Sequence, residues 1–158
     1  MKVNLTFGSK DIKQDFINGD PFALPNDKLG RVICHPENLD LIAEDGQIEE
    51  LIAHFVINHI SYKKVKNMLL NWIKKLSHNG TLEILYVDIF EICRLLSTNQ
   101  IDEREANMLI YGNQNSDWEI NKNIISTYTL KNFFEDNKLR IESVGRNNYI
   151  TKIKVRRI

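Results

Sequence analysis

The feature that most constrains this chain is a pair of apolar runs joined by a strongly amphipathic stretch. The first run extends from Leu51 to Ile60, and the second, from Leu82 to Val87, begins just after Asn79-Gly80. Short apolar runs on either side of a helical repeat predict a strand, a helix and a strand. Two strands joined in this way are parallel, buried on both faces and connected with a right-handed crossover. Because ligands in such sheets bind beyond the C-terminal strand ends, we expect function near Asn58-His59 and Val87-Asp88.

The stretch between the two runs predicts a helix from Tyr62 to Ser77. Its apolar residues recur every three or four positions and so share one face; they are Val65, Leu69, Trp72, Ile73 and Leu76. Ser61 is a suitable N-terminal cap, and Gly80 suits the left-handed residue that often follows a helix. The lysines of the first turns indicate either a solvated face or attraction for an anionic substrate.

Local patterns predict the remaining elements. Before the crossover we expect strands at Val3 to Phe7, Phe16 to Asn18 and Arg31 to His35. After it we expect helices at Ile89 to Leu96, at Asp102 to Tyr111 and from Ser126 or Thr127 to Asp136, then a hairpin of Arg140 to Gly145 and Tyr149 to Val155. The alternating cations Lys152, Lys154 and Arg156 are interpreted as protection of an edge strand, with contact to a nucleic acid as the alternative. This order predicts an α/β three-layer sandwich, forming one domain over residues 1–158.

Composition narrows the class of protein. Lys plus Arg equal Asp plus Glu at 21 each, and this balance argues against a general nucleic-acid binder. Cys34 and Cys93 lie in apolar surroundings without a CxxC partner, so we expect buried free thiols. The N-terminus has no long apolar run, and no segment approaches the ~20 apolar residues that span a bilayer. A cytoplasmic protein is the default expectation.

Several segments resemble parts of a known family. Val3 to Ser9 looks like a first strand with its glycine loop, and Phe16 to Asp20 like a second strand that ends in an acid. Glu44 to Ile60 and Leu82 to Phe90 are similar to a fourth and a fifth strand, and Tyr111 to Gln114 to a Leu-Tyr-Gly-Gly-Gln segment. Together they resemble class I S-adenosylmethionine-dependent methyltransferases, most closely the short bacterial and phage predicted methyltransferases related to sugar and polysaccharide methylation. The resemblance implies a Rossmann-like, mostly parallel seven-stranded sheet with an antiparallel C-terminal hairpin.

The sequence also departs from the family pattern. Thr6 replaces a glycine of the loop, Phe7 replaces a small residue, and the helix after the loop is almost deleted. The third strand ends in His35-Pro36-Glu37, where the family has an Asp that contacts adenine. Asn58 replaces a Glu, and Val87 replaces a Pro. We therefore expect the frame to be retained with a degenerate glycine loop and a weakened hold on the cofactor.

The resemblance implies a set of residues that bind S-adenosylmethionine. Asp20 would accept hydrogen bonds from the ribose hydroxyls, and Gly8 would let the chain pass beneath the cofactor. His35 and Glu37 would contact adenine. Each has a plainer reading, namely a turn aspartate, a turn glycine and a polar loop. The complete set of cofactor-binding candidates is Asn4, Thr6, Gly8, Asp20, His35, Glu37 and Asn58.

His59 and Asp88 are the candidate catalytic residues. His59 would remove a proton from a hydroxyl or amine acceptor, and Asp88 would bind the substrate. Either side chain alternatively caps the helix that follows it. His54 is expected to be a core histidine, whereas Trp118 is expected to cover a sugar ring or to anchor its loop. No spacing of residues resembles a metal-ligand set.

Two functions from different classes stay open. The first is an S-adenosylmethionine-dependent methyltransferase that acts on a small molecule or sugar. The second is a methyltransferase-like protein that no longer catalyses and serves as a binding or assembly subunit. A different reaction on the same cofactor is a third alternative. We expect no membrane and no nucleic-acid partner, and leave open a homo-oligomer or a protein partner.

Overall fold

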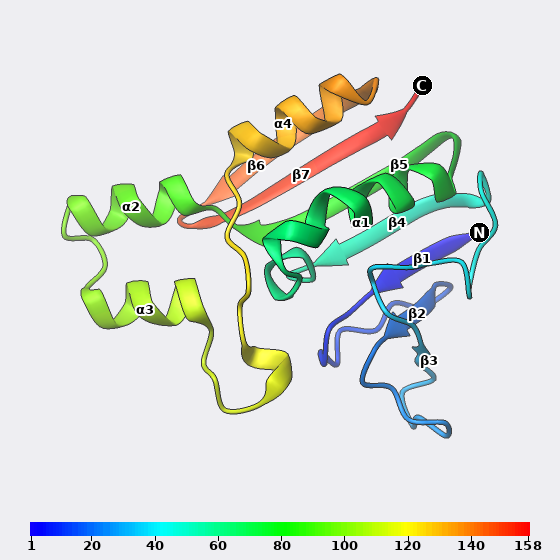
Figure 1. Cartoon of the computed structure of the whole chain (residues 1–158), viewed down its shortest axis with the longest axis horizontal. Helices are drawn as coiled ribbons and strands as arrows, with labels where there is room; N and C mark the ends of the chain where they lie inside the picture. Colours follow the sequence, from blue (N-terminus) through cyan, green and yellow to red (C-terminus); the bar gives the residue numbers. More distant parts are fainter.

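A computed structural model describes residues 1–158, and its seven strands form a single sheet (Figure 1). In chain order the elements are β1 (Lys2–Leu5), β2 (Ile17–Asp20), β3 (Val32–Ile33), β4 (Ile48–His54), η1 (Ile57–His59), α1 (Tyr62–Lys75), β5 (Leu76–Val87), α2 (Ile89–Ser97), α3 (Glu103–Tyr111), η2 (Asp117–Glu119), α4 (Thr127–Asp136), β6 (Leu139–Asn147) and β7 (Ile150–Arg157). The strand order is β3-β2-β1-β4-β5-β7-β6, and β7 alone runs antiparallel to the other six strands. The predicted fold class is thereby confirmed.

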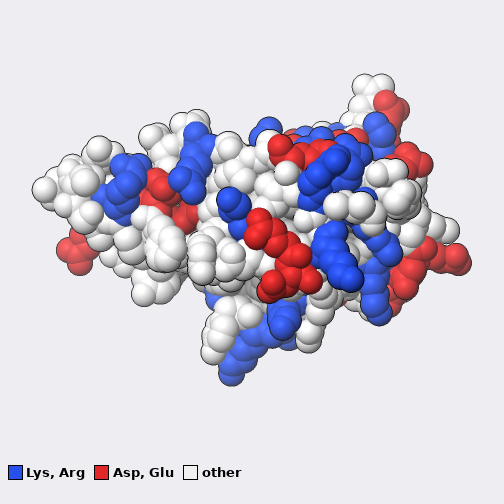
Figure 2. Space-filling view, turned by 90° about the horizontal axis from the view of Figure 1, so that it is seen from above, with Lys and Arg blue, Asp and Glu red and all other residues white.

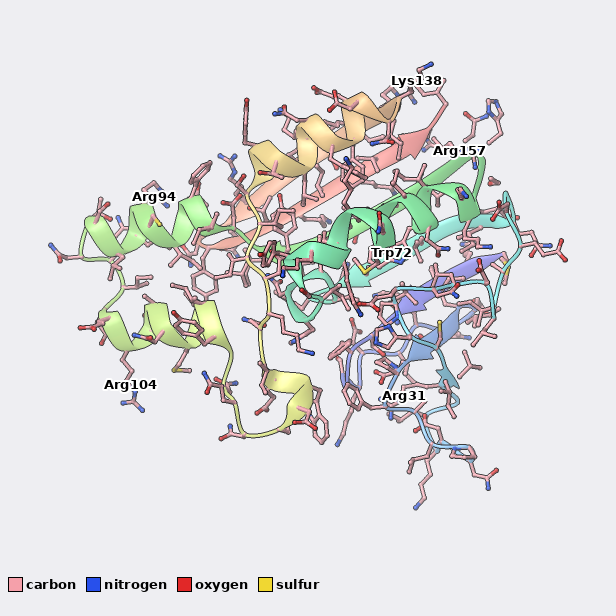
Figure 3. All side chains as sticks on the ribbon, viewed as in Figure 1. Arg31, Trp72, Arg94, Arg104, Lys138 and Arg157 are labelled. Atoms are coloured by element: carbon pink, nitrogen blue, oxygen red, sulfur yellow. The ribbon has the colours of Figure 1, made fainter.

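The crossover β4–α1–β5 forms the middle of the molecule. Strands β4 and β5 pair in parallel, with Ala53 beside Ile84. Helix α1 buries Val65, Leu69 and Trp72, and Trp72 lies beneath the helix with its ring N–H donating to Pro36 O at 2.7 Å (Figure 3). The periodicity of the apolar residues thus identified the buried face of α1 correctly.

The ends of α1 differ from the prediction. The helix ends at Lys75, before the predicted Ser77, and the Ser61 side chain makes no capping hydrogen bond. Gly80 is not the left-handed residue, because Asn79 takes that conformation at φ +64. Gly80 lies in β5, where a Cβ atom would fall 2.7 Å from the backbone oxygen of Ile48. The close approach of β4, rather than the end of the helix, is what requires glycine at this position.

The apolar run from Leu51 to Ile60 is only partly a strand. β4 ends at His54, and Phe55 adopts a left-handed φ of +57. The chain then forms the short turn η1, from which Ile57 still reaches the core. Asn58 and His59 therefore stand at the C-terminal edge of the sheet as expected, although a turn and not a strand carries them.

Helices α1 and α4 lie on the same face of the sheet (Figure 1). The main core lies between them and the strands, and its largest members include Tyr86, Leu82 and Phe134. Helices α2 and α3 extend past the end of the sheet and pack around a smaller core that includes Ile92 and Leu95. Asp88, Asp102 and Ser126 cap α2, α3 and α4 through side-chain oxygens.

Two predictions about individual side chains need correction. β7 lies between β5 and β6, so its cations do not protect an edge. Instead, Lys152 Nζ lies 3.9 Å from Glu83 on β5, and Arg156 pairs with Glu142 on β6, so the alternation reflects cross-strand ion pairs. Of the two free thiols, Cys34 is buried as predicted but Cys93 is exposed on α2.

The charged residues are mixed over the surface. On the face seen in Figure 2, Lys and Arg side chains lie among Asp and Glu side chains and do not gather into one large patch of a single sign. No helix is both long and apolar enough to cross a bilayer.

Candidate functional site

Asp20, the last residue of β2, is fully buried, and its carboxylate is held by the chain itself. Its Oδ2 accepts from the Thr6 hydroxyl at 2.6 Å and from Gly8 N at 2.8 Å. Its Oδ1 accepts from Phe22 N at 2.8 Å. One of these bonds comes from the hydroxyl of Thr6, the residue for which the resemblance implies a glycine. In this arrangement the carboxylate presents no face to solvent.

Arg31 closes the remaining side of Asp20 and is a site residue that the sequence reasoning missed. Its Nη1 lies 3.4 Å from Asp20 Oδ2, while Nε and Nη2 bind the two oxygens of Asp27 at 3.0 and 2.9 Å (Figure 3). The Arg31 hydrogen bond lowers the pKa of Asp27 to about 2. A two-pronged pair of this geometry is among the stronger ionic contacts. The spacing of four residues between Asp27 and Arg31 was the available signal.

Trp118, from η2, covers Gly8. Gly8 has a φ of +73, and a Cβ atom there would fall within 2.7 Å of three side-chain atoms of Trp118. The ring of Phe22 lies 5.6 Å from Trp118 and 5.1 Å from Phe7. Phe7 in turn stacks on His59 with centroids 4.8 Å apart. These aromatic rings lie against the loop that faces the cofactor in the resembled family.

His59 is held in one protonation form. Its Nδ1 lies 2.8 Å from the carbonyl oxygen of Ile120, which can only accept, so Nδ1 carries the hydrogen. Burial is the main cause that lowers the pKa of His59, and the charge of Lys122 adds to it, whereas the Ile120 hydrogen bond opposes it. At neutral pH the ring is therefore uncharged, and Nε2 is left as an acceptor.

Asp88 has the capping role rather than an open position. It is buried, and its Oδ1 accepts from Phe90 N at 2.8 Å. Its Oδ2 accepts from the backbone N of Thr127 at 2.8 Å and also from the Thr127 hydroxyl. Asp88 thus caps α2 and ties the start of α4 to the end of β5.

Asn58 and Asn4 bridge neighbouring segments. The Asn58 side chain accepts from Val87 N and donates to Asn123 O, both at 3.3 Å, and so joins η1 to the end of β5 and to the chain leading into α4. Asn4 donates to Asn18 Oδ1 at 2.8 Å. Both side chains have structural partners in the folded chain.

Three cavities surround His59. The first, of about 330 Å³, lies between the loop after β1 and the ends of β4 and β5; the second, of about 310 Å³, lies between η1 and the segment after α3. The third, of about 130 Å³, lies beside His35, Glu37 and Lys64. Five predicted site residues line these cavities: Thr6, His35, Glu37, Asn58 and His59. The other four, Asn4, Gly8, Asp20 and Asp88, line none of the three.

His54 is more than a core histidine. Its Nε2 lies 2.9 Å from Glu83 Oε1, its Nδ1 lies 3.9 Å from Asp11, and its ring lines the same cavity as His59. His54 and Glu83 are diagonal neighbours on β4 and β5 because Ile52 is the residue opposite Glu83. Only the strand register reveals this pair. No group of three or more His, Cys, Asp or Glu side chains is arranged to hold a metal ion.

Comparisons with known proteins find similar structures but no similar sequences. No protein-family model and no curated protein sequence matches the chain. A methyltransferase from Thermotoga maritima, described as a possible histamine N-methyltransferase, matches 100% of this chain and 83% of its own, with a TM-score of 0.63 and 14% identity. The 1,6-didemethyltoxoflavin-N1-methyltransferase of Burkholderia thailandensis matches 99% of this chain and 71% of its own, with a TM-score of 0.63 and 10% identity.

Other matches are longer proteins. An O-methyltransferase family protein from Burkholderia thailandensis matches 90% of this chain, with a TM-score of 0.59 and 12% identity, but the chain spans only 44% of that protein's length. The chain likewise spans 43% of a Bordetella parapertussis protein described as a possible exported protein. At these identities the similarity shows the fold, which is that of class I methyltransferases.

Proposed function

We propose that the chain is an S-adenosylmethionine-dependent methyltransferase whose cofactor site is closed in the arrangement described. Its support is the class I fold over the whole chain, with an acid at the end of β2 beside the loop after β1. The observation that carries the proposal is His59, an uncharged histidine with a free Nε2 between cavities of about 330 and 310 Å³. A small molecule or a sugar is the acceptor class that we assign to it.

His59 would act on the acceptor. When bound, S-adenosylmethionine supplies an already activated methyl group, so the protein needs mainly to position the two molecules. An acceptor hydroxyl or amine must also lose a proton, and a histidine within hydrogen-bond reach can take it. The Ile120 carbonyl fixes the hydrogen on Nδ1, and Nε2 is therefore the atom that would receive the proton.

The cofactor does not fit the site as it is arranged here. Asp20 is saturated by Thr6, Gly8, Phe22 and Arg31, and Trp118 occupies the space over Gly8. Removing Trp118 would uncover Gly8 at modest cost, because residue Trp118 is already 44% exposed. The Asp20 contacts would have to loosen as well. The geometry described therefore supports no reaction step through the cofactor.

A second function is favoured by the same contacts. If Asp20 and Trp118 are permanent parts of the packing, the fold serves as a binding or assembly subunit without catalysis. The burial of Asp20 supports this alternative, since a carboxylate with four protein donors has little to gain from a ribose.

Calorimetric titration with S-adenosylmethionine and S-adenosylhomocysteine separates the two functions. For a closed methyltransferase, Trp118→Ala should bind either ligand at least about tenfold more tightly than the natural chain, a change of about 1.4 kcal/mol, because the ligand no longer has to displace the indole, although it still has to loosen the Asp20 contacts. The control Tyr128→Ala removes another exposed aromatic residue, which lines none of the cavities around His59, and this variant should bind as the natural chain does. Absence of binding to both the natural chain and Trp118→Ala at millimolar ligand would support the non-catalytic subunit.

A further inference from the structure

A fourth cavity, larger than the three around His59, lies away from that residue. It has a volume of about 460 Å³ and opens between α1 and α4, next to the start of α2 and the segment that leads into α4. None of its lining residues lines the three cavities around His59. Its volume falls within the range of about 300–1,000 Å³ that is usual for small-molecule sites.

The walls of this cavity are mainly apolar. Nine of its thirteen lining residues are hydrophobic, which suits an apolar ligand body. Two of them, Tyr62 and Phe90, are large aromatic residues with exposed fractions of 69% and 62%. Tyr62 is the first residue of α1, and Phe90 is the second residue of α2. Exposed aromatic side chains beside an apolar hollow are typical of a binding surface.

Lys66 is the only charged residue that lines the cavity. It lies one turn after Tyr62 on the same face of α1. No acidic side chain lines the cavity, and Lys66 forms no ion pair, whereas Lys64 and Lys75 of the same helix both do. The lining residues Ser126 and Thr129 already bond to each other at the cap of α4. The Asn123 side chain donates to Ile57 O at 3.5 Å. Lys66 is therefore the one charged group of the lining that can pair with an ionic ligand.

We propose that this cavity binds an amphipathic anion, namely a hydrocarbon body with a single carboxylate. The apolar walls take up the hydrocarbon body, and Lys66 pairs with the carboxylate at the rim. This proposal does not depend on methyl transfer, since the cavity is separate from His59. We assign it to a small carboxylate rather than to a neutral lipid, because Lys66 adds a charge–charge attraction, and with it a stronger hydrogen bond, only for an anionic ligand.

A competition assay tests the proposal on the full chain. The neutral fluorescent probe N-phenyl-1-naphthylamine is added first and is then titrated with dodecanoate or with dodecanol, each below its aggregation limit. We expect dodecanoate to displace the probe at a concentration at least tenfold lower than dodecanol. Lys66→Met keeps the apolar stem and should remove that preference, whereas Lys74→Met, which alters a lysine outside the cavity, should retain it.

A variant that fills the cavity shows whether the probe binds there or elsewhere on the protein. Thr129→Trp places a large ring in the cavity from the exposed side of α4 and should abolish probe binding while the far-ultraviolet circular dichroism stays unchanged. The proposal is overturned if neither ligand displaces the probe, if Lys66→Met keeps the preference for dodecanoate, or if the folded Thr129→Trp variant still binds the probe. Concentration-dependent dimerisation that Thr129→Trp prevents would assign the cavity to a second copy and would also overturn it.

Discussion

The indole of Trp118 lies directly on the α-carbon of Gly8. This contact joins two segments that are far apart in the sequence: η2, which follows α3, and the loop after β1. Residue 8 is thus restricted to glycine for two independent reasons, a φ of +73 and the lack of space for a Cβ atom.

Gly8→Ala tests this contact. We expect the free energy of unfolding to fall by about 2–4 kcal/mol, since a left-handed backbone and an overpacked side chain each cost about 1–2 kcal/mol or more. Gly46→Ala is the matched control, because Gly46 has a φ of +79 but no atom within 4 Å of its would-be Cβ. Urea unfolding measures both. Equal losses for the two variants would mean that Trp118 is not seated on Gly8 in solution.

Thr6→Val tests the hydrogen bond to Asp20. Valine keeps the shape of threonine but removes a donor to a buried carboxylate, so we expect a loss of about 1.5–3 kcal/mol in the free energy of unfolding. Thr151→Val is a matched control, because Thr151 is equally buried but its hydroxyl has no hydrogen-bond partner. That substitution should be neutral or stabilising. A neutral Thr6→Val would remove the Thr6–Asp20 bond from the account of the site.

His59 should make stability depend on pH. The folded state lowers the pKa of His59 below its usual 6.5, mainly through burial. As the pH falls, the unfolded chain therefore takes up the proton at a higher pH than the folded chain does. Stability should therefore fall as the pH drops below about 6.5 and level off below the folded pKa. His59→Gln should reduce that slope in urea unfolding measured at several pH values. An unchanged slope, or a ring that titrates above 6.5 by NMR, would contradict the buried neutral form.

The two thiols should differ in reactivity. Cys93 is exposed on α2, whereas Cys34 is buried, and burial raises its pKa to about 11. Since the thiolate is the reactive form, one equivalent of thiol should react with Ellman's reagent in the folded chain and a second only after denaturation. Cys93→Ser should abolish the first phase. Reaction of both thiols at equal rates would show that the end of β3 opens readily.

Helices and turns with local signals were predictable from the sequence. Asp88, Asp102 and Ser126 each stand just before an apolar repeat, and each caps a helix, since a cap needs only residues two or three positions away. The end of β4 was not predictable in the same way. Ile57 and Ile60 lie beyond the strand but are buried, because η1 turns them into the core. An apolar run alone does not tell a continuing strand from a buried turn.

The same contrast between local and tertiary signals applies to the candidate site. The position of Asp20 at a strand end follows from a short local pattern, but its saturation by Thr6 and Arg31 depends on how three separate segments meet. The pairing of His54 with Glu83 depends on the register between β4 and β5. Such contacts are set by tertiary packing, which residue spacing does not encode.

The place of β7 in the sheet has a consequence for synthesis of the chain. β6 pairs only with β7, and β7 lies between β5 and β6, so β6 has no strand partner until residues 150–157 have left the ribosome. Until then β5 presents a long open edge, including Leu82 and Ile84, to other nascent chains. A product that stops before Ile150 loses more than β7, because β6 then has no strand partner and β5 keeps an open edge in the middle of the molecule, where other chains can add.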